Sequence, residues 1–179
     1  MHRIKGLTLI EAVVIITIVG IISIGLANFI RQTIDIWRFI DFHNDVSFEG
    51  KKTLDWIIRD LKKIKDSRSI NTAESTHINF ESSEDEDENG IEDIIDINFD
   101  SDQHIINRSI DGGTTIYPLC RDVENLTFTY YDSLGNIIPT PVARNKLDDI
   151  RKIRVEITLQ RGKERVNFFS VVIPRNLYR

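Results

Sequence analysis

Uncharged and mostly apolar residues run without interruption from Ala12 to Ile30. As a helix, these nineteen residues would measure about 28 Å, which is close to the roughly 30 Å hydrocarbon thickness of a bilayer. Arg3 and Lys5 precede the run, and Arg31 follows it. A short basic leader before an apolar helix predicts a segment that crosses a membrane with its N-terminus in the cytoplasm.

Apolar residues keep a helical spacing beyond this run, from Arg31 to about Lys65. Steps of three and four residues place one apolar stripe on an otherwise polar helix. The clearest part of the stripe is Leu54, Ile57, Leu61 and Ile64. No proline precedes Pro118, so the sequence predicts one long helix from Leu7 to Lys65. Gly50 is its weakest position, at a cost of about 1 kcal/mol relative to Ala.

The period of the pattern changes from helical to two after this helix. Apolar residues alternate with polar ones and predict short strands near 78–80, 95–99, 103–110, 126–130, 153–159 and 166–173. Residues 111–113 and 161–163 contain glycine and predict turns. One long helix followed by several strands predicts an α+β fold, in which the apolar face of the helix packs on an antiparallel sheet.

The stretch Gly6-Leu7-Thr8-Leu9-Ile10-Glu11 stands at the start of the apolar run. It resembles the cleavage and methylation motif of type IV prepilins and type II secretion pseudopilins. The resemblance implies that a prepilin peptidase cuts between Gly6 and Leu7, that Leu7 becomes N-methylated, and that Glu11 assists filament assembly. The sequence departs from the family at Leu7, where phenylalanine is usual.

Further stretches resemble minor pilins of the PilW type and J-type pseudopilins. They are Thr53–Lys62, Val123–Asp132 with Gly135, Ile150–Val155 and Val172–Leu177. The resemblance implies a leader at 1–6, a transmembrane and filament-core helix at 7–30, its amphipathic continuation at 31–66, and a globular antiparallel sheet domain at 67–179. It also implies a pilin-like fold, in which a long N-terminal helix with a membrane-spanning first half packs on the sheet.

The same resemblance implies where the protein acts and with what. The precursor would cross the bacterial inner membrane once, with a cytoplasmic N-terminus and an extracytoplasmic C-terminal domain, before it joins a pilus or pseudopilus near the tip. Its partners would be other minor and major pilins or pseudopilins, the prepilin peptidase and methyltransferase, and the inner-membrane assembly platform.

The chemistry of Glu11 can also be argued without the family. A carboxylate at the end of a membrane helix is costly to bury and needs a partner. After cleavage, the nearest cation would be the α-amino group of Leu7, from the same subunit or from a neighbour. Pairing between neighbours would set the axial register of stacked helices. The alternative is that Glu11 lies at the level of the lipid headgroups and is solvated.

An ordinary secretory signal is a second interpretation of the N-terminus. Gly25-Leu26-Ala27 fits a small-x-small cleavage site, so that a soluble exported protein would begin at Asn28. The apolar run is longer than the usual 7–15 residues of such signals, and the helical pattern continues past Ala27. The two hypotheses therefore differ in whether residues 7–27 survive in the mature protein.

Composition excludes several other classes. The net charge is −5 and would become −7 without Arg3 and Lys5, and an acidic chain without a basic stripe is a poor nucleic-acid binder. Cys120 is the single cysteine, so no internal disulfide forms, and we expect a small buried apolar residue there. The sequence contains no phosphate-binding glycine loop, catalytic triad signature or cysteine-based zinc spacing, so we predict that the protein is not an enzyme.

One acidic stretch, residues 82–93 with Asp96, could bind a cation. Asp85, Asp87, Asn89, Asp93 and Asp96 match positions 1, 3, 5, 9 and 12 of the calcium-loop template, and Gly90 matches position 6. Two features depart from an EF-hand: the twelfth position is Asp rather than Glu, and the flanks are predicted strands. Ca²⁺ is thus a candidate ligand, and the alternative is a solvated acidic loop. With a signal peptide, this loop would suggest an exported calcium-dependent binding module or adhesin.

Overall fold

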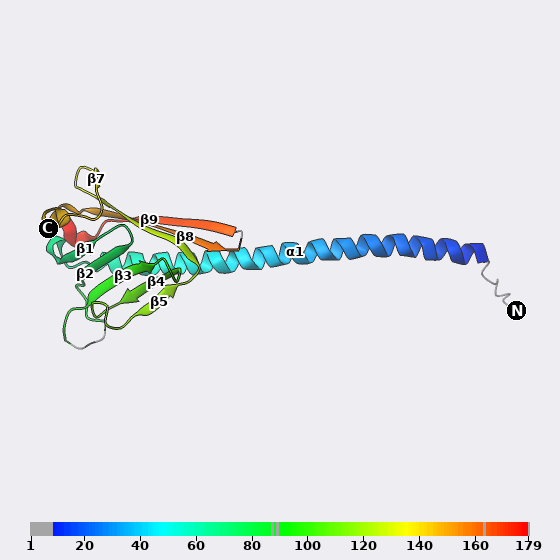
Figure 1. The fold of residues 1–179 in the computed structure, drawn as a ribbon, viewed down its shortest axis with the longest axis horizontal. Helices are drawn as coiled ribbons and strands as arrows, with labels where there is room; N and C mark the ends of the chain where they lie inside the picture. Colours follow the sequence, from blue (N-terminus) through cyan, green and yellow to red (C-terminus); the bar gives the residue numbers. More distant parts are fainter. Residues whose placement is uncertain (1–8, 87, 89, 163, 179) are drawn as a thin grey trace. The chain divides into compact units, whose positions relative to one another are not determined.

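The structure is a computed structural model that describes residues 9–86, 88, 90–162 and 164–178, with the backbone alone at 38–43, 164 and 178 (Figure 1). The chain divides into two compact units, one up to Asn44 and one from Asp45 to Arg179. One helix, α1 (Leu9–Lys62), contributes its first part to the N-terminal unit and its last part to the C-terminal unit.

The C-terminal unit contains two antiparallel sheets. The first has five strands in sequential order: β1 (Ile70–Ala73), β2 (His77–Glu81), β3 (Ile94–Asp100), β4 (Ile105–Ser109) and β5 (Tyr117–Cys120). The second has four strands in the order β7 (Ile137–Ile138), β6 (Val123–Tyr131), β8 (Lys152–Arg161) and β9 (Glu164–Val172). Three short 3-10 helices complete the unit: η1 (Ser67–Ser69), η2 (Arg144–Asp149) and η3 (Arg175–Tyr178).

The last part of α1 contacts both sheets. Its apolar stripe is buried, since Ile57, Leu61 and Ile64 just beyond its end are all 0% exposed. Thr53 donates a hydrogen bond to the carbonyl oxygen of Leu119 in β5, and Gly50 lies against Phe168 in β9. The inward residues of β6 and β8, such as Phe128 and Val155, close the core from the other side.

The α+β fold and the long helix are confirmed, with two changes of detail. The expected single sheet is divided into two, because β5 ends the first sheet and the chain turns at Asp122, whose φ is +58°, before β6 begins the second. Pro118 lacks an N–H and weakens β5 as a partner for a further strand. The helix ends at Lys62 rather than Lys65, because Ile64 already forms an isolated bridge with Ser82.

Candidate functional site

The first part of α1 is an apolar helix without cover in the described chain. Leu9–Trp37 is long and apolar enough to cross a membrane by length and composition, and it is the one such helix among the described residues. Its large side chains are exposed; Ile16, for example, is 71% exposed. Such a surface is stable in a membrane or among other helices and not in water.

Hydroxyl groups within this segment are satisfied by the helix itself. Thr17, Ser23 and Thr33 each donate a hydrogen bond to the carbonyl oxygen four residues earlier, at 2.8, 2.7 and 2.9 Å respectively. In hydrocarbon an unsatisfied donor costs several kcal/mol, on the order of the cost of burying a polar group. These local bonds therefore make the segment compatible with an apolar environment.

Glu11 lies in the first turn of α1 and is exposed. A carboxylate there is favoured by the positive end of the helix dipole. The predicted cleavage-site residues Gly6 and Leu7 lie outside the described residues, so the pairing of Glu11 with the amine of Leu7 stays a prediction.

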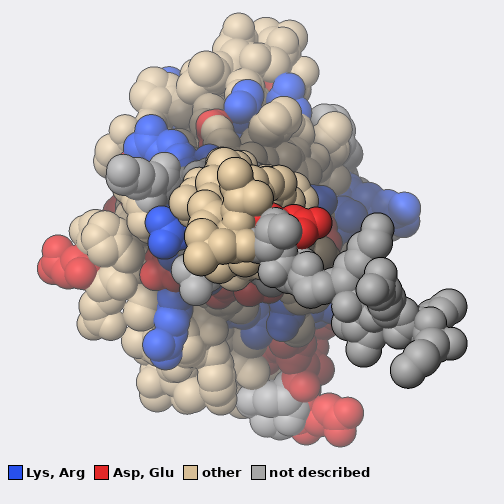
Figure 2. Space-filling model, turned by 90° about the vertical axis from the view of Figure 1, so that its right-hand side faces the viewer, with Lys and Arg blue, Asp and Glu red and all other residues tan. Residues whose placement is uncertain are grey.

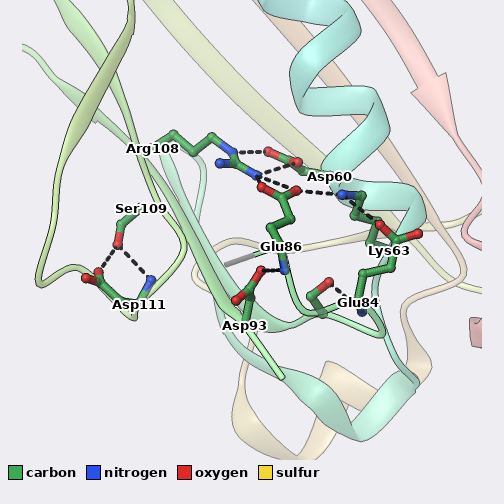
Figure 3. A network of polar contacts seen from close by, with 9 residues as sticks. Asp60, Lys63, Glu84, Glu86, Asp93, Arg108, Ser109 and Asp111 are labelled. Carbon is green, nitrogen blue, oxygen red and sulfur yellow. Dashed lines mark hydrogen bonds and ion pairs between the residues drawn. The ribbon is translucent and has the colours of Figure 1, made fainter. Parts of the chain in front are cut away.

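A cluster of charged residues, which sequence reasoning missed, joins α1 to the first sheet (Figure 3). Asp60 in α1 is fully buried, and Arg108 in β4 is 8% exposed. Arg108 donates from Nε to Oδ2 of Asp60 at 2.7 Å and from Nη2 to Oδ1 at 3.0 Å. Burial raises the pKa of Asp60, and these two hydrogen bonds oppose that effect. Loss of either partner would leave the other charge buried and unpaired, which strongly destabilises a folded protein.

The acidic loop is attached to this buried pair through Glu86. Nη2 of Arg108 donates to both carboxylate oxygens of Glu86 at 3.0 Å, and Nζ of Lys63 donates to Oε1 at 2.5 Å. Lys63 also pairs with Glu84 at 2.9 Å, and Lys65 pairs with Glu92. Burial alone would raise the pKa of Glu86, but the hydrogen bonds from Lys63 and Arg108 lower it below its usual value. Lys63 and Lys65, just beyond the end of α1, and Arg108 in β4 thus attach the loop through its glutamates.

The predicted calcium ligands are distributed over this loop and strand β3. Asp85 accepts a hydrogen bond from the N–H of Gly90 at 2.7 Å, and Asp93 accepts one from the N–H of Glu86 at 2.8 Å. Asp96 accepts hydrogen bonds from His77, Asn79 and Asn98. Asp87 and Asn89 lie outside the described residues.

In the described part of the chain, no three His, Cys, Asp or Glu side chains are grouped so that they could hold a metal ion. Two of the five predicted ligands are not among those residues, and the calcium site therefore stays a prediction. The described geometry gives the loop a structural role, because its glutamates pair with Lys63, Lys65 and Arg108.

One signal in the sequence could have identified Asp60 as a buried charge that needs a partner. Asp60 stands three residues after Ile57 and four before Ile64, and it is therefore on the apolar stripe of the helix. A carboxylate on a buried stripe requires a cation from elsewhere in the fold. Arg108 fits that requirement, since it is buried in β4 two residues after the buried Ile106.

Trp56 packs beside this pair on α1. The guanidinium carbon of Arg59 lies 3.7 Å from the centre of its ring, and that of Arg108 lies 5.8 Å from the same centre. Cations over an aromatic face are attracted by its quadrupole. The ring therefore favours the charged guanidinium groups of Arg59 and Arg108.

Cys120 is buried at the end of β5, as we expected for the single cysteine. Burial raises the pKa of its thiol to about 11, so the thiol is neutral at physiological pH and unsuited to nucleophilic chemistry. Lys and Arg are interspersed with Asp and Glu on the described residues of the face in Figure 2, without a continuous basic stripe. No protein-family model matches the chain, and no curated protein matches it either.

Proposed function

We propose that this protein is a minor pilin or pseudopilin, a structural subunit of a type IV pilus or type II secretion filament. The observation that supports this most is the first part of α1, an apolar helix whose side chains remain exposed from Leu9 to Trp37. It is continuous with a helix that packs its last part into a β-rich unit. An anchor before assembly and a core helix after assembly both use such a surface.

The N-terminal motif gives the proposal its chemistry. A prepilin peptidase cuts after Gly6 on the cytoplasmic side, and the new amino group of Leu7 is methylated. Glu11 then pairs with the α-amino group of a neighbouring subunit and sets the register of the helices. Removal of Arg3 and Lys5 with the leader leaves that amine and Glu11 as the charges at the entry to the apolar segment.

The competing proposal of an exported binding module requires cleavage after Ala27. Helix α1 runs without a break from Leu9 to Lys62, which places Ala27 in the interior of a helix. Peptidases cut extended backbone, so the continuous helix favours the filament subunit.

The N-terminal sequence and intact mass of the protein from host membranes test the proposal. A chain that begins at methylated Leu7 is expected, and a Gly6→Val variant should keep its leader because a branched side chain blocks the cleavage site. Ala27→Leu is the matched control. Its mature protein should also begin at methylated Leu7, and its mass should differ only by the change of that side chain. A chain that begins at Asn28 would contradict the proposal and support the exported module.

A further inference from the structure

The two sheets have four outer strands among the described residues, and three of them are protected. β1 has four residues, and the carbonyl oxygen of its Ala73 accepts a hydrogen bond from the N–H of Val142 at 2.8 Å. β5 has four residues and contains Pro118. β7 has two residues and is followed by Pro139. Short length, proline and cover by a loop are the usual means by which proteins prevent pairing at a sheet edge.

The fourth outer strand, β9, has none of these protections. It has nine residues and no proline, and β8 is its only strand partner in the described chain. In Figure 1 it lies at the rim of its sheet. On its outer face Phe169 and Val171 are 63% and 47% exposed, and Ile173 just beyond its end is 54% exposed. A long apolar edge of this kind is a template for another strand.

Basic side chains lie near both ends of β9, although its first residue is Glu164. Arg165 near its start has a side chain that is 64% exposed and pairs with Glu124. Beyond its end, Ile173 lies with Lys62 and Arg175 around a cavity of about 300 Å³. Among the described residues, neither Lys62 nor Arg175 has an ion-pair partner within 4.0 Å.

The C-terminal segment that includes β9 has a net charge opposite in sign to that of the rest of the chain. Residues 161–179 contain five Lys or Arg and one Glu, a net charge of +4, whereas the other residues carry −5 − 4 = −9. The edge therefore combines an apolar centre with basic ends in an acidic protein. A strand with an apolar centre and acidic ends is complementary to it.

The direction of β9 argues against a second copy of the chain as the occupant. Phe168 lies beside Gly50, and the amide of Asn176 donates to the carbonyl oxygen of Ile64 at 3.0 Å, so β9 runs in the same direction as α1. Symmetric pairing of two copies through one edge is antiparallel. Residues 45–62 of the two copies would then run in opposite directions, whereas subunits of one filament enter it in the same direction.

We propose that the free edge of β9 binds an extended segment of a different protein subunit by strand addition. The segment has apolar residues at alternate positions, which pair with Phe169 and Val171, and acidic residues at its ends, which meet Arg165 and the Lys62–Arg175 pair. The inference rests on the proposed function in excluding a second copy of the chain and in placing that partner among the other filament subunits.

The test uses the full chain in detergent micelles and a labelled nine-residue peptide of alternating valine and threonine with glutamate at both ends. Fluorescence anisotropy should show binding that weakens at least tenfold in Phe169→Thr and in Val171→Thr, which keep the preference for a strand but remove exposed apolar surface. Ile116→Thr is the matched control, because Ile116 is 56% exposed beside the protected edge of β5. It should bind as the unaltered protein does.

Two changes to the peptide and one to the protein test the remaining features. Replacement of its terminal glutamates by lysine should abolish binding, and Arg175→Gln should reduce the preference for glutamate. Methylation of alternate backbone nitrogens should also abolish binding, because strand addition depends on main-chain hydrogen bonds.

Absence of binding to the unaltered protein would overturn the proposal, as would equal weakening in Ile116→Thr. Self-association in sedimentation that Val171→Thr abolishes would assign the edge to a second copy and would also overturn it. The assay involves no filament. A protein that binds the peptide but begins at Asn28 in the host would therefore retain the edge site and lose the proposed filament role.

Discussion

Asp60 and Arg108 form a buried ion pair that links the last turn of α1 to strand β4 of the first sheet, with two hydrogen bonds of 2.7 and 3.0 Å. Asp60→Asn should destabilise the protein by about 3–5 kcal/mol, because Arg108 would remain buried with half of its charge partners removed. Urea unfolding of the full chain in detergent, followed by tryptophan fluorescence, measures this change.

The partly exposed pair of Arg154 and Glu156 is the matched control for Asp60. The two side chains are 38% and 34% exposed and 3.1 Å apart. Glu156→Gln should cost no more than about 1 kcal/mol, the usual value for a surface pair. Equal losses in the two variants would show that the buried pair has no special role.

The close approach of Gly50 to Phe168 predicts that the effect of Gly50→Ala on stability depends on the side chain at position 168. A Cβ at position 50 would lie 2.2 Å from Cε2 of Phe168, so Gly50→Ala should destabilise the protein even though alanine favours helix by about 1 kcal/mol. In a Phe168→Leu background the same change should be neutral or stabilising. A double-mutant cycle by urea unfolding gives the coupling, and Lys51→Ala on the exposed side of the helix is the control.

The relation between Gly50 and Phe168 also marks the limit of what the sequence could predict. The period of apolar residues located α1 and the longer strands, because each spans several repeats of its pattern. β1, β5 and β7 have two to four residues, too few to display a period of two. Gly50 was predictable as a weak helix position, but its function as the close approach to β9 depends on a residue 118 positions later.

The candidate sites also differ in how far the sequence could predict them. The apolar segment and Glu11 are contiguous in sequence, and they were predictable from a local pattern. The Asp60–Arg108 pair connects residues 48 positions apart. Asp60 was recognisable as a polar residue on an apolar stripe, but the identity of its partner depends on the register of β4, which only the folded sheet determines.

The hydrogen bond between His77 and Asp96 predicts that the stability of the protein depends on pH. Their side chains lie 2.8 Å apart across β2 and β3. The hydrogen bond to Asp96 raises the pKa of His77 above 6.5 against the effect of burial. Burial would raise the pKa of Asp96, but hydrogen bonds from His77, Asn79 and Asn98 hold it below 3.8.

His77 and Asp96 contribute to the free energy of unfolding over different pH ranges. The contribution of His77 is complete below pH 6.5 and is lost as the pH rises through its folded pKa. The contribution of Asp96 is complete above pH 3.8 and is lost as the pH falls through its folded pKa. His77→Gln should therefore flatten the fall in the free energy of unfolding between pH 6 and 8, measured by urea unfolding; an unchanged slope would assign the fall to other groups.

The calcium hypothesis predicts that Ca²⁺ stabilises the folded protein. If Asp85 and its neighbours bind Ca²⁺, millimolar Ca²⁺ should raise the melting temperature of the unaltered protein, by mass action on the folded state. Asp85→Asn should remove that rise, whereas Asp102→Asn in the β3–β4 turn should retain it. Identical melting with and without Ca²⁺ would leave the loop only its structural role of neutralising Lys63, Lys65 and Arg108.

The proposed pairing of Glu11 predicts a separation of two steps. Glu11→Ala should leave cleavage after Gly6 intact, because the peptidase acts at a bond five residues away, but it should reduce incorporation into filaments. Asp35→Ala is the matched control, since Asp35 is an exposed carboxylate on the same helix beyond the charge-free run. Immunoblots of sheared filaments against membrane fractions measure both steps. Normal incorporation of the Glu11→Ala protein would contradict the pairing, and loss of cleavage would move the role of Glu11 from assembly to recognition by the peptidase.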